Sequence, residues 1–449
     1  MRNKILGAIL MAVLVSCAPP AAAGEWTTLT LPNNAIVYDM DIQGDTIWMS
    51  THRSGLLGYD GDLWVVHLSA EGGIRTNNYN YTVQVDSNGD KWVGRDDADA
   101  VDRLDDAGTY TDKTDDIWTY YDYQEELENR RVFSMVEAPQ GGMWFGMRDE
   151  NHNRLGTVEL LIENDDTTTD DDVWYHYDNA WTPDSTDFSD DDVRALAIDD
   201  PGRLWIGYYA TGVDAWDYGN PALYADDSIV HYSSDNGLPS NLVHTLHVGD
   251  DGRVWVGTLG GLAVYDGRTD SWRTIEGLPG LQARAIDTDA LGHVWVGTEN
   301  GVAMVYGNGS VAVTYGTEDG IPNDLISEIA VDRENGVVWA VSVDEATQAT
   351  SLSFLESGYG SSMTNVFAYP NPWKEGRDAP EITVFGAPEG ADVTVIDVSG
   401  QELRKLRSTE PYVWDTLNGA GNEVSSGIYV VRVETPEGEV LFTKVAVIR

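Results

Sequence analysis

The sequence has 449 residues, with 75 Asp and Glu against 27 Lys and Arg, which gives a formal charge of −48. Such a charge repels the phosphates of nucleic acids and the headgroups of anionic lipids, so nucleic-acid binding is excluded. The 16 Trp, 22 Tyr and 42% hydrophobic residues can form a large core, which excludes a wholly disordered chain, and the single Cys excludes an intrachain disulfide.

Residues 1–23 have the layout of a secretory signal peptide: two basic residues, an apolar run and then small residues. The apolar run covers 5–15, about half of the roughly 20 residues that a spanning helix needs, so we expect no transmembrane helix. The sequence Leu-Val-Ser-Cys ending at Cys17 resembles a bacterial lipobox, whereas Ala-Ala-Ala at 21–23 resembles an ordinary cleavage site. Both remain open, so the sequence predicts a secreted protein, a cell-surface protein or an outer-membrane lipoprotein lipidated at Cys17.

A repeated unit follows, and it dominates the sequence from residue 24 to about 360. A turn and a short strand with a central tryptophan recur, as in GDTIWMS, PGRLWIG and DGRVWVG. The repeated tryptophans are Trp48, Trp92, Trp144, Trp205, Trp255, Trp295 and Trp339. Their spacing leaves room for four short strands in each unit, and such a period is the mark of a repeat architecture.

The strands of the unit alternate polar and apolar residues between Gly and Asp turns, as the stretch from Asn241 to Ile275 shows. Units of this size bury their faces by stacking on neighbours, and a closed ring protects their edges. We therefore predict an all-β fold, a seven-bladed β-propeller over residues 24–360. The segment Trp26 to Leu29 matches the outer strand that begins at Trp272, so we predict that this N-terminal strand completes the seventh blade.

The repeats resemble those of the two-component regulator propeller family. The residues that carry the resemblance are GLPSN at 237–241, DDGRVWVGT at 250–258 and GLAVYD at 261–266, and the pattern returns at 289–298 and 301–306. The family occurs outside the membrane in hybrid sensor kinases and in secreted proteins. The resemblance implies a recognition module. The kinase regions of the hybrid sensors have no counterpart in this sequence, so a ligand-sensing role would feed a separate kinase.

Residues 366–449 form a second predicted unit. Short alternating runs at 381–385, 392–397, 412–414, 427–434 and 440–448 between Gly and Pro turns are typical of an immunoglobulin-like β-sandwich. The residues YPNPW at 369–373, SGIY at 426–429 and the basic end of the chain resemble the C-terminal sorting domain of type IX secretion substrates. They also resemble the immunoglobulin-like domain of flagellar hook-capping proteins. The first resemblance implies that the secretion machinery is a partner and that the domain exports or anchors the chain. A plain structural or adhesive role stays open.

In a propeller the loops of one face meet around the central channel, so residues after each Trp strand and before each inner strand are the candidate ligand-binding residues. They combine aromatic rings with Arg and Asn, which suits a carbohydrate, a peptide or a protein partner. The candidates are Arg53, Asn77, Tyr79, Arg131, Arg148, His152, Arg194, Tyr208, Tyr209, Asn241, Thr258, Arg284, Glu299, Asn300 and Asn323.

Calcium is the only cofactor that the acidic residues suggest. DSNGD at 86–90 places oxygen ligands at alternate positions, and further acidic clusters lie at 165–172 and 190–192. A type I turn explains the first segment without a metal, and a solvated charge run explains the others. We therefore predict no required cofactor.

Catalytic motifs are absent from the sequence: we find no nucleophile elbow, no phosphate-binding loop and no zinc-protease helix. The eight histidines show no metal-ligand spacing. The ring resembles that of streptogramin B lyase, which would give His152 or His52 a catalytic role. A non-enzymatic recognition propeller is the favoured hypothesis, and a lyase or hydrolase on the same ring is the alternative. The excess of acid and the six lysines further indicate a salt-adapted surface.

Overall fold

The computed structural model describes residues 26–449 apart from 69–78, 96–99, 123–126, 128–130, 140, 149–157, 163–171, 178–187, 191, 201, 220–226, 268, 358–365, 370–372, 375–380, 386, 388–389, 398–400, 407–411 and 436–439. In these residues the regular structure is β-strand, with three short 3-10 turns at η1 (Pro32–Asn34), η4 (Ser234–Asn236) and η5 (Thr317–Asp319). No helix in the described part of the chain has the length and apolar character to cross a membrane.

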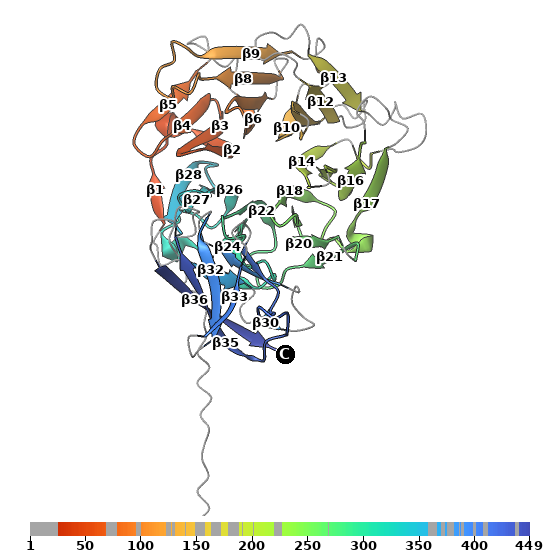
Figure 1. The fold of residues 1–449 in the computed structure, drawn as a ribbon. Coiled ribbons are helices and arrows are strands. Elements are labelled where there is room, and N and C mark those ends of the chain that lie inside the picture. The colour runs from red at the N-terminus through yellow and green to blue at the C-terminus, as the bar shows by residue number, and fades with distance from the viewer. Residues whose placement is uncertain are drawn as a thin grey trace, which may run out of the picture.

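Seven four-stranded antiparallel sheets make up the described residues from 26 to 357, and they stand around a common centre as the blades of a propeller (Figure 1). The first four blades are β2 (Ile36–Gln43), β3 (Thr46–His52), β4 (Leu56–Tyr59), β5 (Trp64–His67); β6 (Asn80–Val85), β7 (Lys91–Arg95), β8 (Val101–Asp105), β9 (Ile117–Tyr121); β10 (Val132–Glu137), β11 (Met143–Met147), β12 (Val158–Ile162), β13 (Val173–Tyr177); β14 (Val193–Ile198), β15 (Leu204–Tyr208), β16 (Val213–Asp217), β17 (Ser228–Tyr232). The other three are β18 (Val243–Val248), β19 (Val254–Thr258), β20 (Gly261–Asp266), β21 (Ser271–Thr274); β22 (Ala283–Thr288), β23 (Val294–Thr298), β24 (Gly301–Val305), β25 (Val311–Tyr315); β26 (Ile326–Asp332), β27 (Val337–Val343), β28 (Thr350–Glu356), β1 (Thr27–Leu29).

The repeated Trp-x-Gly pattern reflects close packing between neighbouring blades. The Trp strand is the second strand of each blade, and in β7, β11, β15, β19 and β23 every residue is buried. At Gly94 an added Cβ would lie 2.9 Å from Cγ1 of Val132 in the next blade, and at Gly257 it would lie 2.7 Å from the carbonyl oxygen of Ala283. Glycine is required there because any side chain would push the inner strand of the next blade away.

The aspartate six residues before the tryptophan also has a structural role. Oδ2 of Asp86, Asp199 and Asp289 accepts the indole N–H of Trp92, Trp205 and Trp295 at 2.8, 2.9 and 3.0 Å. The other oxygen of each carboxylate accepts backbone N–H groups of the intervening turn. A single side chain thus caps the turn and satisfies a buried indole, which explains the DxxGxxW spacing of the repeats.

The two ends of the ring meet in the seventh blade. Thr27, Thr28 and Leu29 of β1 pair with Phe354, Ser353 and Leu352 of β28. The Thr28 and Ser353 hydroxyl oxygens lie 2.9 Å apart, and the backbone N–H of Trp26 donates to the backbone carbonyl of Asp319 at 3.0 Å. The outermost strand of this blade therefore comes from the start of the propeller, and the other three strands come from its end.

The C-terminal strands form two sheets that share one core. One sheet has the order β29-β31-β34 and the other β30-β36-β35-β32-β33, in which β30 runs parallel to β36. The strands are β29 (Phe367–Tyr369), β30 (Trp373–Lys374), β31 (Ile382–Phe385), β32 (Asp392–Asp397), β33 (Glu402–Lys405), β34 (Tyr412–Trp414), β35 (Gly427–Glu434) and β36 (Val440–Ile448). Ile382 and Trp414 from the first sheet pack in one cluster with Val393, Val431 and Val445 from the second. The unit is a β-sandwich, so the fold is all-β as the sequence predicts.

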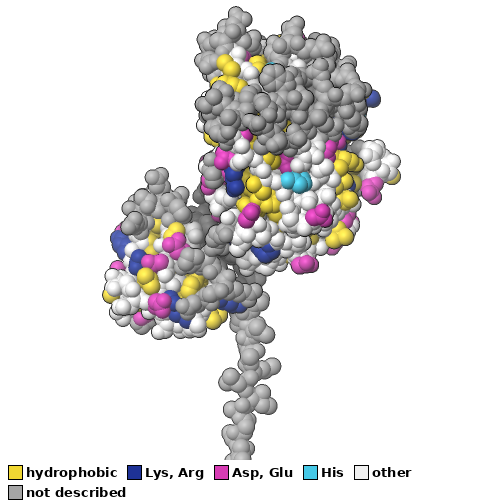
Figure 2. Space-filling view, turned by 90° about the vertical axis from the view of Figure 1, so that its right-hand side faces the viewer, with side chains coloured by type: hydrophobic (Ala, Val, Ile, Leu, Met, Phe, Trp, Pro, Cys, Tyr) yellow, Lys and Arg dark blue, Asp and Glu magenta, His cyan; other side chains and the backbone are white. Residues whose placement is uncertain are grey.

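Negative charge is spread over the propeller surface. Figure 2 shows Asp and Glu side chains scattered over its visible described part, with few Lys and Arg among them. The segment 366–449 has 8 Lys and Arg against 13 Asp and Glu, so nearly all of the charge of −48 belongs to the propeller.

Candidate functional site

The innermost strand of every blade contains a β-bulge at its second or third residue. The strand pairing skips one residue at that place in β2, β6, β10, β14, β18, β22 and β26. A bulge redirects a side chain that strict alternation would send elsewhere, and bulges are common at the rims of barrels and beside active sites. The seven bulged residues, which we call the mouth ring, are Tyr38, Tyr81, Phe133, Arg194, His244, Arg284 and Ser327.

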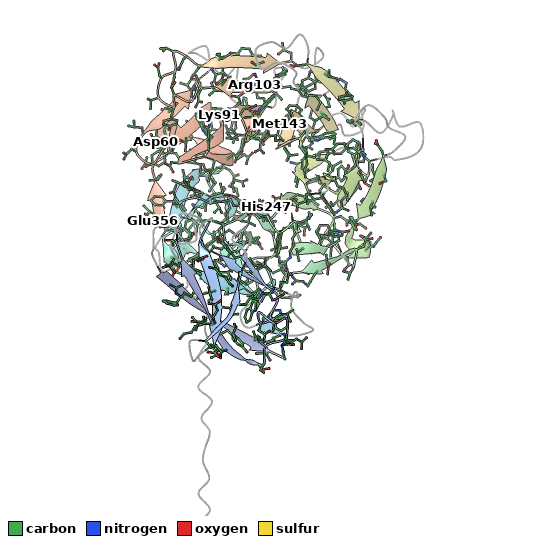
Figure 3. The ribbon with its side chains drawn as sticks, in the orientation of Figure 1. Asp60, Lys91, Arg103, Met143, His247 and Glu356 are labelled. Carbon is green, nitrogen blue, oxygen red and sulfur yellow. The ribbon has the colours of Figure 1, made fainter. Side chains whose placement is uncertain are left out.

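The innermost strands enclose a central cavity of about 630 Å³. Every blade contributes to its lining, which includes all members of the mouth ring except Ser327. His247 lies on the wall of the central opening, as Figure 3 shows. A cavity of this size falls in the range of sites for small ligands or for the end of a larger one.

Blades one to three give the ring an aromatic arc, formed by Tyr38, Tyr81 and Phe133. The rings of Tyr38 and Tyr81 stack with their centroids 5.3 Å apart, and those of Tyr81 and Phe133 lie 4.7 Å apart. His52 stacks on Tyr38 at 5.6 Å, and the Arg194 guanidinium lies 5.0 Å from the centroid of Phe133. Neighbouring side chains thus occupy ring faces along the whole arc.

Blades four to six give the ring a cationic arc, formed by Arg194, His244 and Arg284. Arg194 Nε lies 2.9 Å from Asp192, which also lies 3.3 Å from Arg148, so these two guanidinium groups share one carboxylate. Arg284 donates to the neutral Gln282 at 2.7 Å, and its buried Nε has no hydrogen-bond partner among the described residues. The same holds for the buried Nε2 of His244.

The pKa of His244 reflects first its burial and then the positive charge of its neighbours. Burial, together with the charges of Arg284 and Arg194, lowers the pKa of His244 to about 4. The imidazole is therefore neutral at pH 7, because burial and the two nearby guanidinium groups both disfavour its charged form. An anion bound here would reverse that balance.

Deeper in the channel, four carboxyl groups have raised pKa values: Asp39, Asp41, Asp287 and Glu328. Burial is the main cause in each, and it raises the pKa of Asp41 to about 7. Asp39 and Asp41 accept backbone N–H groups of the second blade at 2.9 and 2.6 Å, and Asp287 accepts one of the seventh blade at 2.7 Å. These three carboxyls join adjacent blades. Their raised pKa values therefore fit a structural role, because structural networks perturb pKa values as active sites do.

Of the residues predicted from sequence, Arg194 and Arg284 belong to the mouth ring itself. Arg53 and Tyr79 lie next to it, since the Arg53 guanidinium donates to the Tyr79 hydroxyl at 2.8 Å and Tyr79 contacts His52. Tyr209 is 46% exposed, and the Arg194 guanidinium lies 4.8 Å from the centre of its ring. Arg148 reaches the ring through Asp192, and its backbone N–H donates to the carbonyl of Arg131.

The polar loop candidates of the later blades form hydrogen bonds to backbone groups of the loops. Asn241 accepts the backbone N–H of Ser234 at 2.6 Å, and Asn300 donates to the carbonyl of Pro279 at 3.4 Å. Glu299 accepts the backbone N–H groups of Leu281 and Gln282 at 2.9 and 2.8 Å. Asn323 is half-buried in the loop before β26. Asn77, His152 and Cys17 lie outside the described residues.

Two candidates are corrected by the structure. Tyr208 is fully buried, and its hydroxyl donates to Asp214 at 2.9 Å. Thr258 is also fully buried, and its hydroxyl donates to the carbonyl of Gly261 at 2.8 Å. Both are the last residue of a Trp strand, so they belong to the blade interior and cannot contact a ligand.

Sequence reasoning missed the other five residues of the mouth ring: Tyr38, Tyr81, Phe133, His244 and Ser327. Each stands in the repeat at the position of Arg194 and Arg284, so aligning the inner strands on those two residues would have found them. The acidic segment suggested for calcium serves its turn instead, because Asp86 accepts the N–H groups of Asn88, Asp90 and Trp92. In the described residues no three His, Cys, Asp or Glu side chains are grouped as metal ligands. Residues 165–171 and Asp191 lie outside the described residues.

Comparison with protein families gives one match: the two component regulator propeller, at residues 237–260. These residues run from the loop before β18 through β19 and contain Trp255. A search of curated proteins finds no match.

Solved structures share the fold at low identity. PorZ, a bacterial surface component of the type-IX secretion system of Porphyromonas gingivalis, is 18% identical with a TM-score of 0.56, over 92% of this chain and 59% of that one. The extracellular domain of BT3049 from B. thetaiotaomicron, assigned to the hybrid two component systems, is 15% identical with a TM-score of 0.58, over 95% and 58%. Virginiamycin B lyase from Staphylococcus aureus is 14% identical with a TM-score of 0.53, over 74% and 99%. The chain spans less than two thirds of the first two structures.

Proposed function

We propose that this protein is a non-enzymatic recognition propeller that acts outside the cytoplasm and binds its ligand at the mouth ring. The observation that carries the proposal is the bulge in all seven inner strands, because six of the seven bulged residues line the central cavity. A fold that needed only to close would not require the same irregularity in every blade. Aromatic residues and arginines are also the residues that most often dominate binding energy.

The ligand classes that suit the ring are a carbohydrate, a peptide or a partner protein. The aromatic arc offers apolar contact area and hydroxyl groups, and the cationic arc offers donors with fixed directions. The cavity of about 630 Å³ admits the end of a chain or a small molecule but not a folded domain. A protein partner would therefore insert a loop or a terminus.

Array binding tests this proposal. The full chain is applied to glycan and peptide arrays beside the variant Tyr81→Ala, with Tyr120→Ala as the control, since Tyr120 lies on the outer strand β9. We expect specific hits for the native chain and the control, and loss of those hits in Tyr81→Ala. Hits that survive in Tyr81→Ala, or no hits for any chain, would contradict binding at the mouth ring.

The alternative of a lyase or hydrolase is tested in parallel with a substrate panel. Turnover by the native chain that is lost in Asp41→Asn or Glu328→Gln would show that the channel carboxyls act on a substrate. We expect no turnover, because three of the four carboxyls already hold backbone N–H groups of adjacent blades.

We further propose that the C-terminal sandwich delivers or tethers the propeller, with the secretion machinery as its partner. Support comes from the signal-like segment 1–23, from the resemblance to sorting domains and from the described role of PorZ as a surface component of a type-IX secretion system. The intact mass of protein recovered from cells tests this proposal. A mass that includes residues 1–23, in a protein retained inside the cell, would contradict it.

A further inference from the structure

Two buried nitrogen atoms of the cationic arc, both on residues that line the channel, have no hydrogen-bond partner among the described residues. Arg284 Nε and His244 Nε2 are buried, come from adjacent blades and lack hydrogen-bond partners in the described part of the chain. A buried donor without a partner loses about 1–3 kcal/mol relative to a satisfied one. Arg284 Nε, and His244 Nε2 in the tautomer that carries the proton there, can donate to an acceptor that a ligand supplies.

The charges at this place favour a ligand group that is anionic and accepts hydrogen bonds. Arg148 and Arg194 share the single carboxylate of Asp192, and the contact of Arg284 is to a neutral amide. The arc therefore keeps positive charge on a propeller that is otherwise strongly negative. A carboxylate matches it, because guanidinium groups bind carboxylates through paired, charge-assisted hydrogen bonds.

The aromatic arc restricts what adjoins that carboxylate. Tyr38 stacks on Tyr81, Phe133 lies tilted against Tyr81, and His52 and Arg194 flank the two ends of the arc, so a ligand meets mainly ring edges. Sugars pack on open aromatic faces. Ring edges carry partial positive charge and attract the face of another aromatic ring.

We propose that the mouth ring captures the free carboxyl terminus of a peptide that ends in an aromatic residue. The terminal carboxylate lies between Arg284 and His244, and the terminal side chain packs against the edges of Tyr81 and Phe133. This inference rests on the proposed recognition function and specifies its ligand. It assigns the charged half of the ring to the terminus and the aromatic half to the last side chain.

Calorimetry with small probes on the full chain tests the proposal. The probes are N-acetyl-phenylalanine, its amide, and glucuronic acid, which presents a carboxylate on a sugar ring. Arg284→Gln removes one positive charge at the mouth. Arg253→Gln is the matched control, because Arg253 precedes β19 in the neighbouring fifth blade, at the end of that strand away from the mouth and beside Asp251. We expect the acid to bind at least about tenfold more tightly than the amide, with Arg284→Gln about tenfold weaker and the control unchanged.

A second readout follows the His244 ring by NMR during titration with N-acetyl-phenylalanine. A bound carboxylate raises the pKa of His244, which now lies near 4, and we expect a rise of at least about one unit. This shift is visible even if the affinity for a single residue is weak, and no rise is expected with the amide.

The outcomes separate the two proposals. Equal binding of N-acetyl-phenylalanine and its amide would overturn the inference. If glucuronic acid binds as tightly as N-acetyl-phenylalanine and is weakened equally by Arg284→Gln, the site binds sugar acids instead. Array ligands whose binding is lost in Tyr81→Ala but kept in Arg284→Gln would support the proposed recognition function and refute the binding of a carboxylate. Absence of any array ligand refutes the proposed function itself.

Discussion

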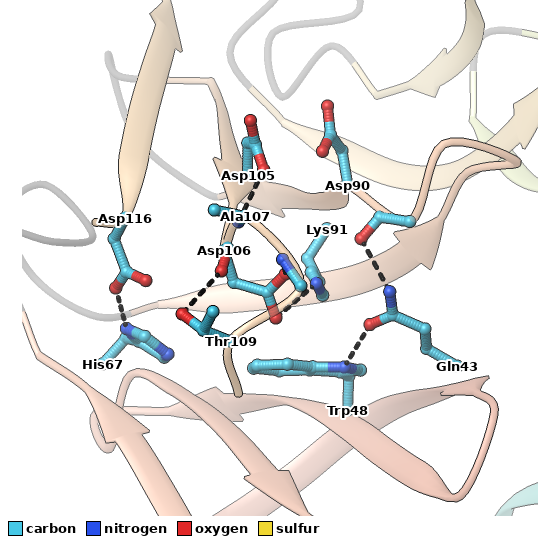
Figure 4. A network of polar contacts seen from close by, with 12 residues as sticks. Gln43, Trp48, His67, Asp90, Lys91, Asp105, Asp106, Ala107, Thr109 and Asp116 are labelled. Carbon is cyan, nitrogen blue, oxygen red and sulfur yellow. Dashed lines mark hydrogen bonds and ion pairs between the residues drawn. The ribbon is translucent and has the colours of Figure 1, made fainter. Parts of the chain in front are cut away.

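Lys91 is the residue that departs most from its repeat. It opens β7 and is fully buried, whereas its counterparts in other blades are Met143, Leu204, Val254 and Val294. Its Nζ lies 2.7 Å from Oδ2 of Asp106 and 4.9 Å from the centroid of the Trp48 indole ring (Figure 4). Two charges taken out of water are stable only together, because removal of either leaves the other buried and unpaired.

The pair can be dissected by a double-mutant cycle. Asp106→Asn keeps the oxygen that accepts the Gly108 N–H but removes the charge, and we expect it to lower the unfolding free energy by about 3 kcal/mol. Adding Lys91→Met, the residue that the third blade uses, should restore most of that loss. Urea unfolding measures both. Equal destabilisation in the single and double variants, or a similar loss in the exposed control Asp112→Asn, would refute the account.

The channel carboxyls make stability depend on pH in an unusual direction. The pKa of Asp41 is raised to about 7 by burial and by repulsion from Asp39 and Asp287. Because the native state holds the proton more tightly than the unfolded chain, this group contributes stability that is fully present below about pH 4 and is lost as pH rises to about 7. Asp41→Asn should therefore lose less stability than the native chain over that interval, by an amount on the order of 2 kcal/mol.

Denaturant titrations at pH 4.5, 6 and 7.5 measure this effect in both chains. The exposed Asp200→Asn serves as the control, since Asp200 lies in a turn on the surface. Parallel curves for Asp41→Asn and the native chain would mean that the carboxyl titrates alike in the folded and unfolded states.

At the scale of elements, the strand β1 joins the two ends of the ring with only three paired residues. Its main apolar contact is Trp26, which is 4% exposed and lies edge-on to Tyr315 with centroids 5.9 Å apart. Removing a buried indole costs about 3–5 kcal/mol, so Trp26→Ala should open the seam. Trp118→Ala is the control, because Trp118 lies in the outer strand β9 and packs against a cluster of the first two blades that includes no residue of the seam. We expect a larger loss of thermal stability and faster proteolysis in Trp26→Ala than in Trp118→Ala, and equal losses would contradict a special role of the seam.

The elements also show how far sequence reasoning reaches. Repeated tryptophans and turns predicted strands of the right kind because each unit carries the same local signals, and the runs at 392–397, 412–414 and 427–434 coincide with strands of the sandwich. The bulges could not be predicted from the sequence, because the side chains of a β-strand are expected to alternate strictly between its two faces. The predicted residues are therefore two or three positions too early in the sequence. Tyr79, Arg131 and Asn241 precede the mouth-ring residues Tyr81, Phe133 and His244.

Burial of polar residues was the other limit. Tyr208 and Thr258 are typical ligand-binding residue types, but a hydroxyl that ends a Trp strand is used within the blade. The channel carboxyls were overlooked for the converse reason: in a sequence with 75 Asp and Glu, nothing local distinguishes the few that face inward.

At the scale of the whole molecule, the charge of −48 destabilises the compact state through repulsion between carboxylates, and this repulsion is strongest at low salt concentration. The Debye length shrinks from about 10 Å at 0.1 M to about 3 Å at 1 M salt, which removes most repulsion between carboxylates on neighbouring blades. We therefore expect the melting temperature at pH 7.5 to rise by several degrees between 0.1 and 2 M NaCl. Near pH 4, where exposed carboxylates are largely protonated, the same salt series should have a clearly smaller effect, which separates screening from a general salting-out of apolar surface. A melting temperature that stays flat or falls at pH 7.5, or an equal rise at both pH values, would show that surface repulsion does not limit the stability of this propeller.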